Sequence, residues 1–125
     1  MHKSRLAAFV IDTHGDDLNQ AKQFWSKALG QDCKDYDSIN FSPINTPDDQ
    51  PHIWLHKVDH PSHIHLDIET DNIDAEVDRL KKLGATVFEK KEKWVVMEAS
   101  TGHRFCVVNP QRNDFVSSDQ VNCWD

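Results

Sequence analysis

The stretch that decides the fold runs from His63 to Pro110 and opens with His-Ile-His-Leu-Asp-Ile-Glu-Thr at residues 63–70. Apolar and polar residues alternate strictly in this opening, which is the pattern of a strand with one buried face. A helical run follows as far as Gly84, and three short strand-like runs continue to Val108. The stretch therefore predicts a strand, a helix and three further strands.

The first half of the chain repeats this plan. Superposing residues 8–12 on residues 63–67 brings Gly30 close to Gly84, so both predicted helices end at a glycine. Two tandem β-α-β-β-β modules are the simplest account, with a two-layer sheet as the alternative. The strands expected in the first module, two of them weaker candidates, are Arg5–Asp12, Asp32–Tyr36, Ile39–Ile44 and His52–Val58. Residues 1–4 are expected to be a loose start.

Size, charge and cysteine content limit the class of protein. The 125 residues predict one domain, with module one at about 5–58, module two at about 63–110 and a tail at 111–125. The net charge of −7 disfavours a nucleic-acid partner. The three cysteines form no C-x-x-C pair, and no apolar run approaches the length of a membrane span. The chain is therefore expected to be cytoplasmic, without a membrane partner.

Strand alternation divides the side chains between two faces of the predicted sheet. The apolar face, expected to be covered by the helices, carries Phe9, Ile11, Ile64, Leu66, Ile68, Phe105 and Val107. The opposite face carries Asp12, Trp54, His56, His63, His65, Asp67, Arg104 and Cys106. This polar face is either a solvent-facing sheet surface or the inner lining of a pocket, and alternation alone does not choose between them.

The order of these motifs resembles a known family. The segments that carry the resemblance are Val10-Ile11-Asp12, Phe24-Trp25, Leu29-Gly30, His65-Leu66-Asp67, Leu83-Gly84-Ala85, Trp94-Val95-Val96-Met97 and Phe105-Cys106-Val107-Val108. Over about residues 5–110 they resemble a glyoxalase-like domain of the vicinal-oxygen-chelate superfamily. The resemblance implies an α+β fold of paired β-α-β-β-β modules forming a U-shaped, incompletely closed barrel around a pocket, often in a homodimer.

Metal-using members of this superfamily hold a divalent ion with four ligands, usually histidine and glutamate. The resemblance places these ligand positions at Val10, His56, His65 and Cys106. Valine cannot bind a metal, and a thiol stands where a carboxylate is usual. We therefore expect no metal cofactor. If one binds, the resemblance assigns zinc, nickel, manganese or iron to His56, His65 and Cys106.

Two functional hypotheses follow. The first is a metal-independent protein that binds a small aromatic or carbonyl-bearing molecule. The second is a divalent-metal-dependent lyase or dioxygenase acting on such a metabolite, with Asp67 moving a proton. The candidate ligand-binding residues are Trp54, His56, His65, Asp67, Arg104 and Cys106. For Arg104 a structural ion pair with Asp67 or Asp12 is the favoured alternative, and for Cys106 an inert buried thiol.

Overall fold

The computed structural model describes residues 1–34 and 36–125, which form two compact units. Unit 2 comprises Ala8–His65, and unit 1 comprises Met1–Ala7 with Leu66–Asp125. Strands β1 (His2–His14) and β4 (His63–Thr70) each contribute residues to both units. The expected α+β class is therefore confirmed.

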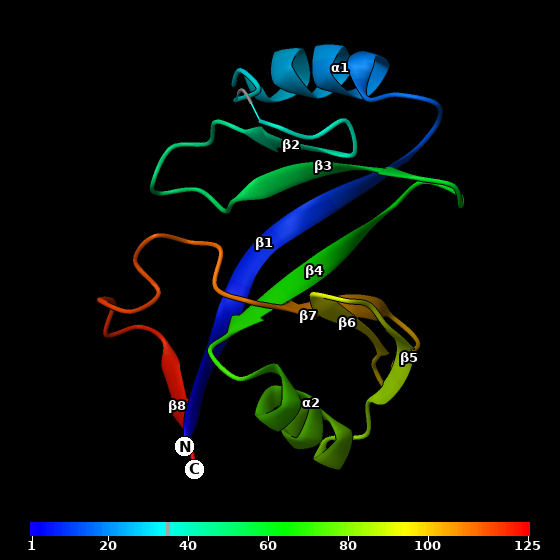
Figure 1. Cartoon of the computed structure of the whole chain (residues 1–125). Helices are drawn as coiled ribbons and strands as arrows, with labels where there is room; N and C mark the ends of the chain where they lie inside the picture. Colours follow the sequence, from blue (N-terminus) through cyan, green and yellow to red (C-terminus); the bar gives the residue numbers. More distant parts are fainter. Residues whose placement is uncertain (35) are drawn as a thin grey trace. The chain divides into compact units, whose positions relative to one another are not determined.

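Unit 2 is built on the second part of β1. Strand β3 runs parallel to β1, with Asp12 opposite His56, and β2 is antiparallel to β3 (Figure 1). The elements are α1 (Asn19–Leu29), β2 (Phe41–Ile44) and β3 (Ile53–Val58). The weak strand candidate at residues 32–36 lies partly outside the described residues. Of its described residues, only Cys33 makes a bridge, to Ile44.

Helix α1 packs on this sheet through the apolar stripe that its spacing predicts. Ala21 and Trp25 contact a core that includes Ile11 and Leu55, and Leu55 is fully buried. Gly30 ends the helix with a φ of 69°, a left-handed conformation that glycine adopts without a steric cost. Local helix signals thus place α1 correctly.

Unit 1 contains the predicted strand, helix and three strands. Strand β7 pairs in parallel with β4 and antiparallel with β6, and β5 pairs antiparallel with β6 (Figure 1). The elements are α2 (Ile73–Lys82), β5 (Thr86–Lys90), β6 (Trp94–Glu98), β7 (Arg104–Val108) and β8 (Asn122–Trp124). Asn72 caps α2 by accepting a hydrogen bond from the backbone N–H of Ala75.

The core of unit 1 lies between α2 and strands β5, β6 and β7. Val77 and Leu80 of the helix pack against Met97 and Val107, both of which are fully buried. No helix among the described residues is long and apolar enough to cross a membrane.

The predicted apolar face is confirmed only in part. Ile11 joins the core of unit 2, and Ile68 and Val107 join the core of unit 1. Ile64 and Leu66 were expected on the same covered face, but they are 60% and 42% exposed. Alternation fixes which side chains share a face, whereas the extent of helix coverage decides which of them are buried, so the prediction was wrong for these two residues.

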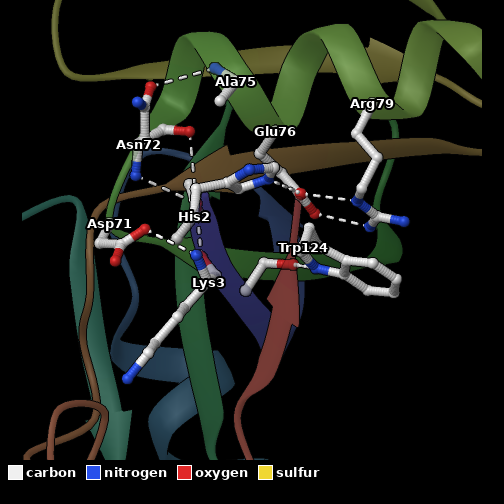
Figure 2. A network of polar contacts seen from close by, with 10 residues as sticks. His2, Lys3, Asp71, Asn72, Ala75, Glu76, Arg79 and Trp124 are labelled. Carbon is white, nitrogen blue, oxygen red and sulfur yellow. Dashed lines mark hydrogen bonds and ion pairs between the residues drawn. The ribbon is translucent and has the colours of Figure 1, made fainter.

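The start of the chain is ordered, contrary to the expected loose start. His2 lies in β1, is buried, and donates from Nε2 to the carboxylate of Glu76, 2.8 Å away. Arg79 donates two further hydrogen bonds to Glu76 (Figure 2). Burial raises the pKa of Glu76, but these hydrogen bonds outweigh it and hold the pKa below its ordinary value.

The tail also belongs to unit 1. Strand β8 pairs antiparallel with the start of β1, with Trp124 opposite His2. The Arg79 guanidinium lies over the Trp124 ring, 3.9 Å from the ring centre (Figure 2). The Trp124 Nε1–H donates to the hydroxyl of Ser4. Trp124 therefore anchors the end of the chain to its beginning.

The buried Glu76 carboxylate makes the stability of unit 1 sensitive to acid. Glu76→Gln is expected to lower the free energy of unfolding by about 1–3 kcal/mol at neutral pH, since it removes charge-assisted hydrogen bonds. In the wild type, the unfolded chain takes up the Glu76 proton first as the pH falls below the ordinary glutamate value of about 4.3, so stability is lost on acidification. Urea unfolding at several pH values measures both effects.

Glu92→Gln is the matched control, because Glu92 is exposed in a turn. The control is expected to behave as the wild type. An equal loss of stability in both variants, or none in either, would contradict a stabilising role for the buried carboxylate.

Candidate functional site

The carboxylate of Asp12 is the centre of a polar cluster in unit 2. Asp12 is 3% exposed and lies near the end of β1. The parallel register of β1 and β3 brings His56 beside it. His63 and His65 reach it from the first residues of β4. Polar residues at alternate positions of neighbouring strands thus converge on one buried charge.

Three histidines contact the Asp12 carboxylate. The Nδ1 atom of His65 lies 2.6 Å from Oδ2, and the Nδ1 atom of His56 lies 3.1 Å from Oδ1. His63 approaches Oδ2 with Nε2 at 3.1 Å. An ionised carboxylate only accepts hydrogen bonds, so His56 and His65 each donate an N–H to it, whereas His63 makes a close contact.

The histidines keep Asp12 ionised despite its burial. Burial raises the pKa of the carboxyl, but hydrogen bonds from His56 and His65, together with the attraction of their positive charge, hold the pKa far below its ordinary range. A buried charge is stable only when it is paired and hydrogen-bonded, which Asp12 satisfies through these rings. The cluster therefore offers a fixed negative charge.

A groove of about 630 Å³ begins at this carboxylate. We call the part lined by Asp12 and His63 the polar end of the groove; Ala21, Phe24 and Trp25 of α1 also line it. The lining residues are Ile11, Asp12, Thr13, His14, Gly15, Asp16, Asp17, Gln20, Ala21, Phe24, Trp25, Ser62, His63 and Ile64. All of them belong to unit 2.

Two large apolar side chains in the groove are open to solvent. Phe24 and Ile64 are each 60% exposed. The Phe24 ring meets Trp25 edge to face, with ring centres 5.0 Å apart. The ring is thereby supported on one side by a core residue of α1. Exposed apolar surface beside a buried charge is an arrangement typical of ligand sites.

The predicted candidates Trp54 and His56 belong to an aromatic row beside this cluster. The ring of Trp54 meets Tyr36 and Phe41 edge to face, and Phe41 stacks on His56 at 4.2 Å. His56 and His65 meet at Asp12, as described above. Trp54, His56 and His65 are not among the residues that line the groove. Their role in ligand binding stays a prediction.

The other three candidates lie in unit 1. Asp67 and Cys106 are buried and face each other in the parallel pair of β4 and β7. Arg104 pairs with Glu98 at 3.1 Å and stacks over the ring of Phe88, 3.4 Å from its centre. A structural ion pair was the favoured expectation for Arg104, although the partner is Glu98 and not Asp67 or Asp12. The binding roles of these three residues stay predictions.

Sequence reasoning missed the central role of Asp12 and the contribution of Phe24. Strand alternation placed Asp12 on the polar face, but it could not show that His56 and His65 contact this residue from two other strands. Phe24 stands next to Trp25, the residue on the buried stripe of α1, and helical spacing could have indicated that Phe24 points away from the core. His63, which alternation placed on the polar face, contacts the cluster while being 45% exposed.

Comparison with known proteins identifies the family. Residues 8–108 match the family described as glyoxalase-like domain. The chain belongs to this family. No curated protein matches this glyoxalase-like domain at a significant level.

Solved structures share the fold at low sequence identity. A structure described as NAD-dependent benzaldehyde dehydrogenase from Legionella pneumophila has a TM-score of 0.64 and 9% identity, covering 82% of this chain and 99% of that one. Methylmalonyl-CoA epimerase from Mycobacterium tuberculosis has a TM-score of 0.61 and 16% identity, covering 86% and 88%. A glyoxalase/bleomycin resistance protein/dioxygenase superfamily member from Vibrio splendidus 12B01 has a TM-score of 0.56 and 17% identity, covering 85% and 100%.

The residues at the ligand positions that the resemblance assigned do not fit the superfamily's four-ligand metal site. Val10 is buried and apolar at the first of these positions. His56 and His65 in unit 2 both direct Nδ1 toward Asp12, an arrangement that leaves Nε2 of each ring as a potential ligand atom. Unit 2 therefore provides two imidazoles and a valine where the chelating set would need a further charged ligand.

The charge of Asp12 is expected to stabilise unit 2. Asp12→Asn replaces a charged acceptor with an amide of the same shape, and should lower the free energy of unfolding by about 1–3 kcal/mol. Urea unfolding followed by tryptophan fluorescence measures the loss, because Trp25 and Trp54 both lie in this unit. Asp16→Asn, at an exposed groove residue, is the control and should leave the stability unchanged. Equal stability of both variants would contradict this role for Asp12.

Proposed function

We propose that this glyoxalase-like domain binds a small aromatic or carbonyl-bearing molecule in the groove of unit 2, without the superfamily's metal-chelating quartet. The observation that carries the proposal is a groove of about 630 Å³ that joins exposed Phe24 to the buried Asp12 carboxylate. Small-molecule sites commonly occupy roughly 300–1,000 Å³ and combine apolar walls with a few fixed polar groups.

The apolar wall suits a planar or hydrophobic part of a ligand. Phe24 and Ile64 expose large side chains into the groove, and Trp25 supports the Phe24 ring. Covering these side chains would remove apolar surface from water, which is favourable at about 25 cal/mol per Å². A ring placed against Phe24 would gain further from offset or edge-to-face packing.

The polar end restricts the charge of the ligand. Three lining residues are aspartates, Asp12, Asp16 and Asp17, and the described lining includes no lysine or arginine. An anionic ligand would meet repulsion there, so a neutral or cationic molecule is favoured. The His63 ring lies at the polar end beside Asp12.

The fold does not decide between binding and catalysis. The similar structures carry names as different as an epimerase and a dehydrogenase, and unrelated functions often share one fold. The incomplete chelating set supports binding over the alternative, a divalent-metal-dependent lyase or dioxygenase. The proposal includes a cytoplasmic location, which the unpaired cysteines support.

A thermal-shift screen of neutral and cationic aromatic or carbonyl compounds tests groove binding. Phe24→Ala is expected to weaken the binding of a compound found in this screen by roughly three- to tenfold, because the variant loses one aromatic contact with it. The melting temperature of the free protein should change little, because Phe24 is mostly exposed. Phe88→Ala is the matched control, a phenylalanine 53% exposed on β5 and outside the groove.

Running the screen with EDTA and with added Zn²⁺, Ni²⁺, Mn²⁺ or Fe²⁺ separates the two functions. Stabilisation that persists in EDTA and falls in Phe24→Ala supports the proposal. Stabilisation that requires a metal, or that is equally affected by Phe88→Ala, contradicts it.

The proposal also includes a homodimer, as the family resemblance implies. Apolar residues left exposed outside the groove support it, among them Val116 in the tail and Leu83 at the end of α2. Sedimentation is expected to give about twice the chain mass of 14.4 kDa at concentrations on the order of tens of micromolar. A single-chain mass under these conditions would reject the dimer.

A further inference from the structure

The turn between β3 and β4 places two more metal-ligating groups beside Asp12. His60 lies in this turn and His63 at the start of β4. Asp12, His60 and His63 each offer one potential ligand atom, and these three atoms lie within 4.8 Å of one another. None of these residues occupies a ligand position that the family resemblance assigned. From this arrangement we propose that Asp12, His60 and His63 form a binding site for a divalent transition-metal ion at the polar end of the groove.

The Pro61 carbonyl orients both imidazoles. Its oxygen lies 3.0 Å from Nδ1 of His60 and 3.2 Å from Nδ1 of His63. A carbonyl oxygen has two lone pairs and can accept from both rings. A hydrogen bond of this kind at one ring nitrogen is the usual support for a histidine that binds a metal through the other. Nε2 is therefore the ligand atom of each ring.

The spacing of His63 and Asp12 already suits a shared ion. Nε2 of His63 lies 3.1 Å from Oδ2 of Asp12. Ligands bound at roughly 2.0–2.1 Å around a tetrahedral zinc are separated by about 3.4 Å. His60 is exposed, and its ligand atom lies within 4.8 Å of those of Asp12 and His63.

The charge pattern calls for a cation at this point. Both ring nitrogens of His63 face oxygen acceptors, the Pro61 carbonyl and the Asp12 carboxylate. A neutral imidazole has only one N–H. If Nδ1 carries that N–H and donates to the Pro61 carbonyl, Nε2 needs a second proton or a metal ion to be attracted to the Asp12 carboxylate. Asp16 and Asp17 line the same groove and add to the negative potential.

The geometry of Asp12 suits a metal ligand. His56 and His65 hold its carboxylate in one orientation, and the two carboxylate oxygens have about four lone-pair sites in total. Two imidazoles with one carboxylate select borderline ions such as zinc, iron(II), nickel or cobalt(II) over magnesium or calcium, which prefer oxygen ligands. Asp12 and His63 line the groove, so open coordination positions would face it.

Zinc binding to protein purified without an affinity tag tests this site. Titration against a chromophoric chelator is expected to show one ion bound per chain. His60→Gln and His63→Gln are each expected to weaken binding at least about 100-fold, because loss of an outer-sphere partner alone costs about 10–100-fold. Cobalt(II) in place of zinc should give the visible absorption of a low-coordinate site, and each variant should lose it.

Two controls make the result specific. His103→Gln removes an exposed histidine from a turn in unit 1, and Cys106→Ser removes the thiol at a position that the family resemblance assigns to a metal ligand. Both should bind zinc as the wild type does. Far-ultraviolet circular dichroism checks that His60→Gln and His63→Gln remain folded, as expected for exposed positions.

The proposal is overturned if zinc binds no more tightly to the wild type than to His60→Gln, or if Cys106→Ser abolishes binding while His60→Gln does not. No organic ligand enters this titration. Failure of metal binding would therefore leave the proposed groove ligand unaffected, and failure of the ligand screen would leave the metal site unaffected.

Discussion

The structure of unit 2 depends on keeping one buried negative charge satisfied. Asp12 lies near the end of β1 and lines the groove, and removing a carboxylate from water is costly unless donors replace the solvent. His56 from β3 and His65 from β4 supply those donors. Contacts with the Asp12 side chain therefore link β1, β3 and β4. They also fix the position of a negative charge at the polar end of the groove.

Local signals made the second module and both helices predictable. Strict alternation predicted β4, and the glycines at 30 and 84, both with a positive φ, follow the two helices as predicted. These features depend on neighbours in sequence, which is why the sequence alone sufficed. Alternation could not show how far the helices extend over the sheet, so Ile64 and Leu66 were misplaced.

The candidate site was harder to predict, because its contacts join residues far apart in the chain. His56 and His65 were selected by parity and by family position, but their meeting point, Asp12, depends on the parallel register of β1 and β3. Trp124 illustrates the same difficulty, since its hydrogen bond to Ser4 spans 120 positions of sequence. Belonging to the glyoxalase-like domain family fixes the order of elements, whereas the ligand positions are free to change within that order.

The pairing of β8 with the start of β1 has a topological consequence. With Trp124 opposite His2, the two ends of the described chain are neighbouring strands (Figure 1). A peptide linking residue 125 to residue 1 would thus close a ring at little cost in loop entropy, while new ends could be opened within an exposed turn. The same strands could therefore be connected in a different order along the chain, and a circularly permuted gene could encode the same fold.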